Sequence, residues 1–120
     1  MKIAWRFAHV LCGCADGASR AFDEALNEIR RHPHADDDDR VPRLFLTILR
    51  RRCLKVPARC DLTGRPAALH RLLEPGRSAL TLLCLDVLPA REIQRVLSLD
   101  ERHLAEALEQ ARASLKLSSA

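Results

Sequence analysis

The sequence predicts an all-α protein. Its 120 residues include 21 Leu and 17 Ala but only five Val and four Ile. Leu and Ala favour helices, whereas the β-branched residues that favour strands are scarce here. The four Gly residues are also too few for the tight turns of a β meander. Apolar residues recur at helical spacing along the chain, so we expect helices rather than strands.

These helices should form two small bundles, one in each half of the chain. A chain of this length holds one domain, or two very small domains that share an interface. Residues 56–66 contain two Pro and one Gly, a composition typical of a linker. We therefore expect a first bundle over residues 1–56, a linker over 57–65 and a second bundle over 66–117.

Three helices are expected in the first bundle. Ile3, Phe7 and Val10 share one helical face, and Gly13 ends that helix. The second helix should carry the apolar stripe Phe22, Ala25, Leu26 and Ile29. The polar segment HPHADDDDR separates it from the third helix, which has Pro42 in its first turn. The expected ranges are 3–12, 18–32 and 42–54.

Four short helices are expected in the second bundle, over residues 66–73, 77–87, 89–97 and 100–117. Only Ser98 and Leu99 separate the last two, and Asp100 is a suitable N-cap for the last helix. A helix, a short turn and a second helix form the helix-turn-helix pattern, which many small helical hairpins share.

Several function classes are excluded by what the sequence lacks. No apolar run approaches 18 residues, so we expect no transmembrane helix. There is no glycine-rich phosphate loop, no paired carboxylate set and no nucleophile–base pair, so we expect neither an enzyme nor a small-molecule substrate. The five Cys are an odd number without the spacing of a zinc site. We therefore expect structural thiols in the cytoplasm, Cys84 as a core residue, and no cofactor or metal.

The positive charge is confined to one half of the chain. The net charge is +4, and the excess of Lys and Arg over Asp and Glu lies wholly in residues 1–60. Seventeen of the 20 basic residues are Arg. Because richness in Arg and Ala also follows from a GC-rich genome, this charge is weak evidence for nucleic-acid binding.

Residues 80–115 resemble region 4 of the extracytoplasmic-function sigma factors, the helix-turn-helix that reads the −35 promoter element. The likeness rests on the pattern Leu-x-x-x-Glu-Ile-x-x-Val-Leu over residues 88–97 and on Ala111-Arg112-Ala113 near the end of the chain. Residues 9–33 and 41–54 resemble two helices of sigma region 2. The two similarities occur in the expected order and together cover nearly the whole chain.

The chain departs from a working sigma factor where DNA would be read. The helix that should enter the major groove carries Ala105, Glu106, Ala107, Glu109 and Gln110. Four acids and two bases give residues 100–114 a net charge of −2, whereas DNA affinity needs cations and base readout needs donors. The segment that would read the −10 element holds four successive Asp. The sequence therefore predicts a poor DNA reader.

A nearer resemblance is to the sigma-like domain of PhyR-type general stress regulators, over residues 13–29 and 43–49. That resemblance implies a decoy that binds a small helical anti-sigma factor of the NepR type and so frees the true sigma factor. The anti-sigma factor should lie in an apolar groove where the two halves face each other. The expected protein-binding residues are Phe22, Leu26, Ile29, Glu101, Ala105, Glu106 and Glu109.

Two alternatives remain open at the level of the sequence. In the first, the chain is a working sigma factor that binds core RNA polymerase and promoter DNA, and its nucleic-acid contacts are Arg50, Arg51, Arg52, Arg102 and His103. The arginine triplet more simply forms a solvated helix face. In the second, the chain is a small helical domain of another role, because core packing alone explains every apolar stripe.

Overall fold

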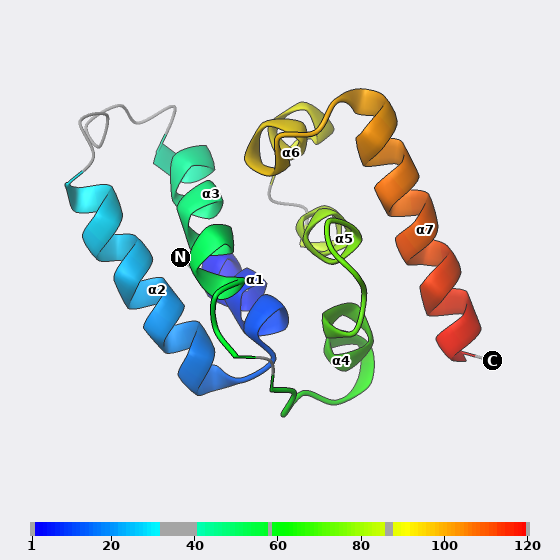
Figure 1. Ribbon diagram of the computed structural model, residues 1–120, viewed down its shortest axis with the longest axis horizontal. Coiled ribbons are helices and arrows are strands. Elements are labelled where there is room, and N and C mark those ends of the chain that lie inside the picture. Colours follow the sequence, from blue (N-terminus) through cyan, green and yellow to red (C-terminus); the bar gives the residue numbers. More distant parts are fainter. Residues whose placement is uncertain (1, 32–40, 58, 86–87, 120) are drawn as a thin grey trace.

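The prediction of an all-α fold is confirmed by a computed structural model, which describes residues 2–31, 41–57, 59–85 and 88–119. These residues form seven helices and no strand (Figure 1). The helices are α1 (Lys2–Cys12), α2 (Ala15–Arg30), α3 (Val41–Cys53), α4 (Gly64–His70), α5 (Gly76–Cys84), α6 (Ala90–Leu97) and α7 (Glu101–Ser119). None of the described helices is long and apolar enough to cross a membrane. The expected polar segment HPHADDDDR, residues 32–40, lies outside the described residues.

Helices α1, α2 and α3 pack side by side, and small residues bring them close. Helix α2 buries Gly17, Ala18, Ala21 and Ala25 against its neighbours. The larger Phe22 packs edge-on against Phe45 of α3, with ring centroids 5.4 Å apart. Edge-to-face aromatic pairs of this kind stabilise a core beyond the area that they bury.

Helix α5 lies at the centre of the second half and contacts α1, α4, α6 and α7. Six of its nine residues are buried, which explains why its sequence is apolar almost all round. Gly76 lies where α5 closely approaches α7. A Cβ atom there would lie 3.1 Å from the carbonyl oxygen of Ala107 and 3.2 Å from the Cβ atom of Ala111.

The two halves share one hydrophobic core. Helix α1 packs against α4 and α5, and α3 packs against α6. The largest buried cluster accordingly joins Phe7 and Leu49 of the first half to Leu82 and Ile93 of the second. The division into a bundle over residues 1–56, a linker over 57–65 and a bundle over 66–117 therefore stays a prediction.

The observed ends of the helices differ from the predicted ends for local reasons. Helix α2 begins earlier than expected, at Ala15, because Cys14 is extended and its Sγ atom accepts a hydrogen bond from the Gly17 N–H at 3.4 Å. Helix α4 ends at His70, three residues early, and α5 ends at Cys84. Cys84 is exposed, so its predicted place in the core is wrong.

Candidate protein-interaction site

Residues 98–100 form the short turn that joins α6 to α7. Ser98 adopts a left-handed conformation with φ of 56°. The Leu99 N–H then donates to the carbonyl oxygen of Gln94 at 2.9 Å, which satisfies the end of α6. The Asp100 side chain accepts a hydrogen bond from the His103 N–H at 2.7 Å, so the predicted N-cap of α7 is confirmed.

Helix α7 buries one face and exposes the other. Leu104, Ala107 and Ala111 are buried at spacings of three and four residues. Ala107 was expected on the outer face with Ala105, and that expectation is wrong because residue 107 lies one turn beyond Leu104 on the buried stripe. The outward residues Glu101, Ala105, Glu106 and Glu109 are all exposed. We call these four residues the acidic face of α7.

The basic side chains near the start of α7 are paired with acids of the same helix. The Arg102 guanidinium lies 3.3 Å from a Glu106 carboxylate oxygen, and the His103 Nδ1 atom lies 2.7 Å from Asp100 Oδ1. Hydrogen bonds from the His103 backbone and side chain hold the pKa of Asp100 below its ordinary value. Arg102 and His103 were the nucleic-acid contacts expected on α7, and each is engaged with a carboxylate here.

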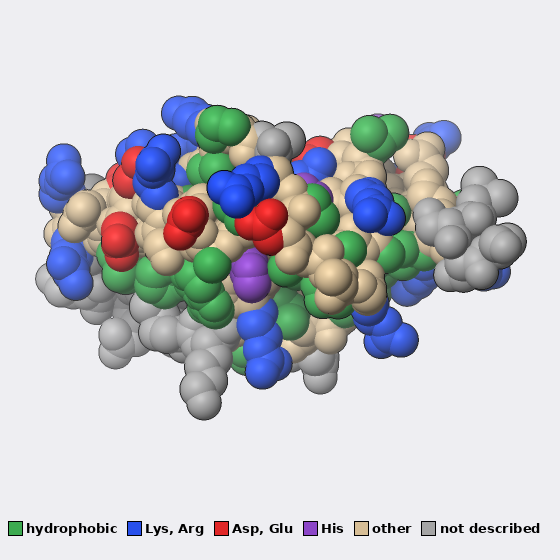
Figure 2. Space-filling view, turned by 90° about the horizontal axis from the view of Figure 1, so that it is seen from below, with side chains coloured by type: hydrophobic (Ala, Val, Ile, Leu, Met, Phe, Trp, Pro, Cys, Tyr) green, Lys and Arg blue, Asp and Glu red, His purple; other side chains and the backbone are tan. Residues whose placement is uncertain are grey.

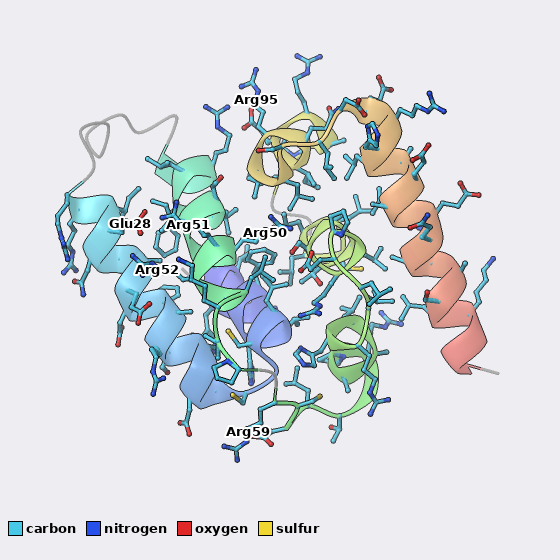
Figure 3. The ribbon with its side chains drawn as sticks, viewed as in Figure 1. Glu28, Arg50, Arg51, Arg52, Arg59 and Arg95 are labelled. Atoms are coloured by element: carbon cyan, nitrogen blue, oxygen red, sulfur yellow. The ribbon has the colours of Figure 1, made fainter. Side chains whose placement is uncertain are left out.

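The arginine triplet of α3 is also engaged within the protein, as Figure 3 shows. Arg51 and Arg52 reach α2 and form ion pairs with Glu28, and the Arg52–Glu28 distance is 2.7 Å. Hydrogen bonds from Arg51 and then Arg52 lower the pKa of Glu28. Arg52 also lies 3.4 Å from Glu24. These pairs tie α3 to α2, so the triplet is more than a solvated helix face.

Arg50 points away from α2 and joins the two halves. Its Nε atom donates to the Ser78 hydroxyl at 3.0 Å, and its terminal nitrogen lies 3.5 Å from a Glu74 carboxylate oxygen. The Ser78 hydroxyl in turn donates to Glu74 at 2.6 Å. Ser78 is fully buried. We call Arg50, Glu74 and Ser78 the inter-half polar cluster.

The predicted binding residues of α2 serve the core more than the surface. Phe22 and Leu26 are half-buried, and Ile29 is 8% exposed. Helices α2 and α7 lie at opposite ends of the molecule, with α1, α3 and α5 between them (Figure 1). The structure therefore does not bring the α2 residues together with the acidic face of α7. The prediction of one groove lined by both sets is wrong, because α1 and α3 pack directly against the second half.

Cysteine and histidine side chains do not form a metal centre in the described part of the chain. No three His, Cys, Asp or Glu side chains there are placed to hold a metal ion, and all five Cys are free. Cys12 and Cys53 lie in contact in the core. A hydrogen bond between the two thiols, followed by burial, raises the pKa of Cys53.

Sequence reasoning missed the partners of the arginine triplet. Glu28, Glu74 and Ser78 carry no motif, and they lie 23 to 28 residues away from the arginines that they contact. The sequence pointed to only one of these contacts, and only weakly: Glu74 and Ser78 are four residues apart, the spacing of neighbours on one helical face. No protein-family model, curated protein or solved structure matches the chain.

Proposed function

We propose that this protein is a sigma mimic that binds a small helical anti-sigma factor and thereby frees the true sigma factor. Support comes from the order of the helices, from the turn between α6 and α7, and from the resemblance of the sequence to the PhyR-type sigma-like domain. The observation that carries the proposal is the acidic face of α7. This helix follows the turn, as a DNA-reading helix would, yet it exposes three carboxylates.

The acidic face has a chemistry that selects its partner. Glu101 and Glu109, together with Glu106, which lies 3.3 Å from Arg102 of the same helix, repel a phosphate backbone, whereas they attract Lys and Arg. Ala105 lies among them and permits close approach of another backbone. An amphipathic helix with basic flanks suits this surface, because its small apolar side chains can meet Ala105 while its cations meet the carboxylates. Such a helix is the expected form of the anti-sigma factor.

The alternative is a working sigma factor that recruits core RNA polymerase to a promoter. One observation favours it: α6 exposes Arg91 at its start and Arg95 in its last turn, although Arg95 lies 3.5 Å from Glu92. Against it, the arginines expected to contact nucleic acid, on α3 and α7, are paired with carboxylates of the protein itself. Each such pair would have to break before its arginine could neutralise a phosphate.

Selection from a pool of random duplex DNA separates the two candidates. For the sigma mimic we expect no enriched sequence, and only weak binding that weakens further as salt is raised. Weak binding here means a Kd on the order of 10⁻⁵ M at physiological salt, which is typical of non-specific contacts. An enriched sequence bound with nanomolar affinity would contradict the sigma mimic and support the working sigma factor.

A further inference from the structure

A cavity of about 580 Å³ opens between α1, α5 and the segment that precedes and begins α4. Two helical stripes face each other across it. Helix α1 contributes Arg6, His9 and Val10, and α5 contributes residues 81, 84 and 85 at the same spacing. Residues of the segment 61–69 line the remaining side. Volumes of this size are typical of sites for small organic ligands.

The cavity wall contains a buried hydroxyl group without a partner. Thr81 is 1% exposed and lines the cavity. Its Oγ1 atom makes no hydrogen bond to any described residue. Native proteins satisfy nearly all buried hydroxyl groups, because an unpaired one keeps the full cost of leaving water. The Oγ1 atom has less than 1 Å² of accessible surface, so a polar atom of a bound ligand would meet this need only after the Thr81 side chain rotates about χ1.

Two described cations line the cavity. Arg6 and Arg65 both line it and are exposed. Among the described acids only Asp61 lines it, and Asp61 lies 3.3 Å from the Arg59 guanidinium. Figure 2, which views the molecule from the side of this segment, shows basic and acidic side chains interspersed with hydrophobic ones. An anionic group is therefore favoured at the rim.

The rest of the lining is apolar. Val10, Leu69 and Leu85 come from three different helices or helix ends and line the same space. Val10 and Leu69 are also members of the smaller of the two buried apolar clusters, so this wall is held rigidly. A ligand that satisfies both the cations and this wall must itself be amphipathic.

We propose that the cavity binds an amphipathic monocarboxylate, for which decanoate serves as the probe. Its carboxylate lies between Arg6 and Arg65 and accepts a hydrogen bond from Thr81. Its apolar body contacts Val10, Leu69 and Leu85. This site is independent of the acidic face of α7, so the proposal goes beyond the sigma-mimic function and can fail without it.

Calorimetric titration of the full chain with decanoate tests the carboxylate assignment. We expect saturable binding by decanoate and binding at least tenfold weaker by the neutral alcohol decanol. The double variant Arg6→Gln/Arg65→Gln should weaken decanoate binding at least tenfold, since both cations at the rim are lost. The matched control Arg20→Gln/Arg30→Gln removes two exposed arginines from α2 and should leave the Kd unchanged.

Thr81→Val tests the proposed hydrogen bond between the Thr81 hydroxyl and the ligand carboxylate, because valine keeps the shape of threonine but has no hydroxyl. We expect decanoate binding to weaken about threefold to tenfold, the range for one lost hydrogen bond. An unchanged or lower Kd in this variant would overturn the placement of the head group. Absence of saturable binding, or equal loss in the α2 control, would overturn the proposal as a whole.

The alkylation rates of the two exposed cysteines show where decanoate binds in the wild-type protein. Cys84 lines the cavity, whereas Cys60 does not. Decanoate at a saturating concentration should slow the alkylation of Cys84 by iodoacetamide at least fivefold and leave the rate at Cys60 unchanged, as followed by mass spectrometry. Equal rates at Cys84 with and without decanoate would contradict binding in this cavity.

Discussion

Arg50 differs from its neighbours Arg51 and Arg52 in what it contacts. Its side chain is 21% exposed and reaches Glu74, which is 20% exposed, and the fully buried Ser78. Arg51 is 53% exposed and pairs with Glu28 at the surface. A charge-assisted hydrogen bond away from water is worth more than an exposed ion pair. Three adjacent arginines should therefore contribute unequally to stability.

Replacing Arg50 and, separately, Arg51 compares the contributions of the two side chains to the free energy of unfolding. Arg50→Leu leaves Glu74 and Ser78 without their shared donor, so we expect the free energy of unfolding in urea to fall by about 2 kcal/mol. The control Arg51→Leu removes the exposed pair and should cost less than about 1 kcal/mol. Equal losses in the two variants would show that the inter-half polar cluster contributes nothing beyond a surface pair.

The Asp100 carboxylate should make the free energy of unfolding fall at acidic pH. Its pKa in the folded protein lies below the ordinary value of 3.8, because the His103 N–H and ring donate to its carboxylate. The charged form is thus preferred in the folded state. This stabilisation is complete above pH 3.8 and is lost as the pH falls through the lower folded value.

Asp100→Asn isolates this contribution, because asparagine can still cap the helix. We expect the wild type to melt at a higher temperature than Asp100→Asn at pH 7. The difference should shrink as the pH is lowered below 3.8. Thermal unfolding followed by circular dichroism at a series of pH values measures it. A difference that stays constant down to pH 2 would contradict the role of the charge.

At the scale of helices, the sequence predicted which helices are present better than it predicted the residues at which they begin and end. The stripe Phe22, Ala25, Leu26 and Ile29 predicted α2 correctly, but the cap that extends it forward is a Cys, a residue not expected at an N-cap. Ala107 was assigned to the wrong face because alanine suits either face of a helix. In both cases the residue type carried too little information, and only the packed structure decided.

The turn between α6 and α7 can be strengthened. Ser98 has a φ of 56°, a conformation that is strained for a residue with a Cβ atom. Ser98→Gly should raise the free energy of unfolding in urea by about 0.5–1 kcal/mol. The matched change Ser19→Gly lies at an exposed position inside α2 and should lower it by about 0.5 kcal/mol. A loss of stability in both variants would contradict the left-handed turn.

At the scale of the molecule, the least predictable feature was how the halves meet. The linker composition and the two apolar-periodic halves suggested separate bundles with a groove between them. The structure has a common core and the inter-half polar cluster instead. Arg50 and Ser78 are 28 residues apart, and no local pattern joins positions at that distance. The acidic face of α7, by contrast, could be read from helical spacing alone.

The central claim is that the acidic face of α7 binds a basic helical partner. Its most direct test is quantitative co-purification from the native host with the tagged wild type, with Glu106→Lys/Glu109→Lys, and with Asp16→Lys/Asp23→Lys on α2. The last variant makes the same change in net charge at the opposite end of the molecule. The four residues are exposed, so each double variant should melt only slightly below the wild type, because it loses either Asp16 from the first turn of α2 or the Arg102–Glu106 pair.

We predict that the wild type and the α2 variant retain one small helical protein with basic segments in equimolar amount. The α7 variant should lose at least nine-tenths of it, because two attractive contacts become repulsive. Recovery of the core RNA polymerase subunits with the wild type, or equal recovery of the small partner by all three proteins, would contradict this account.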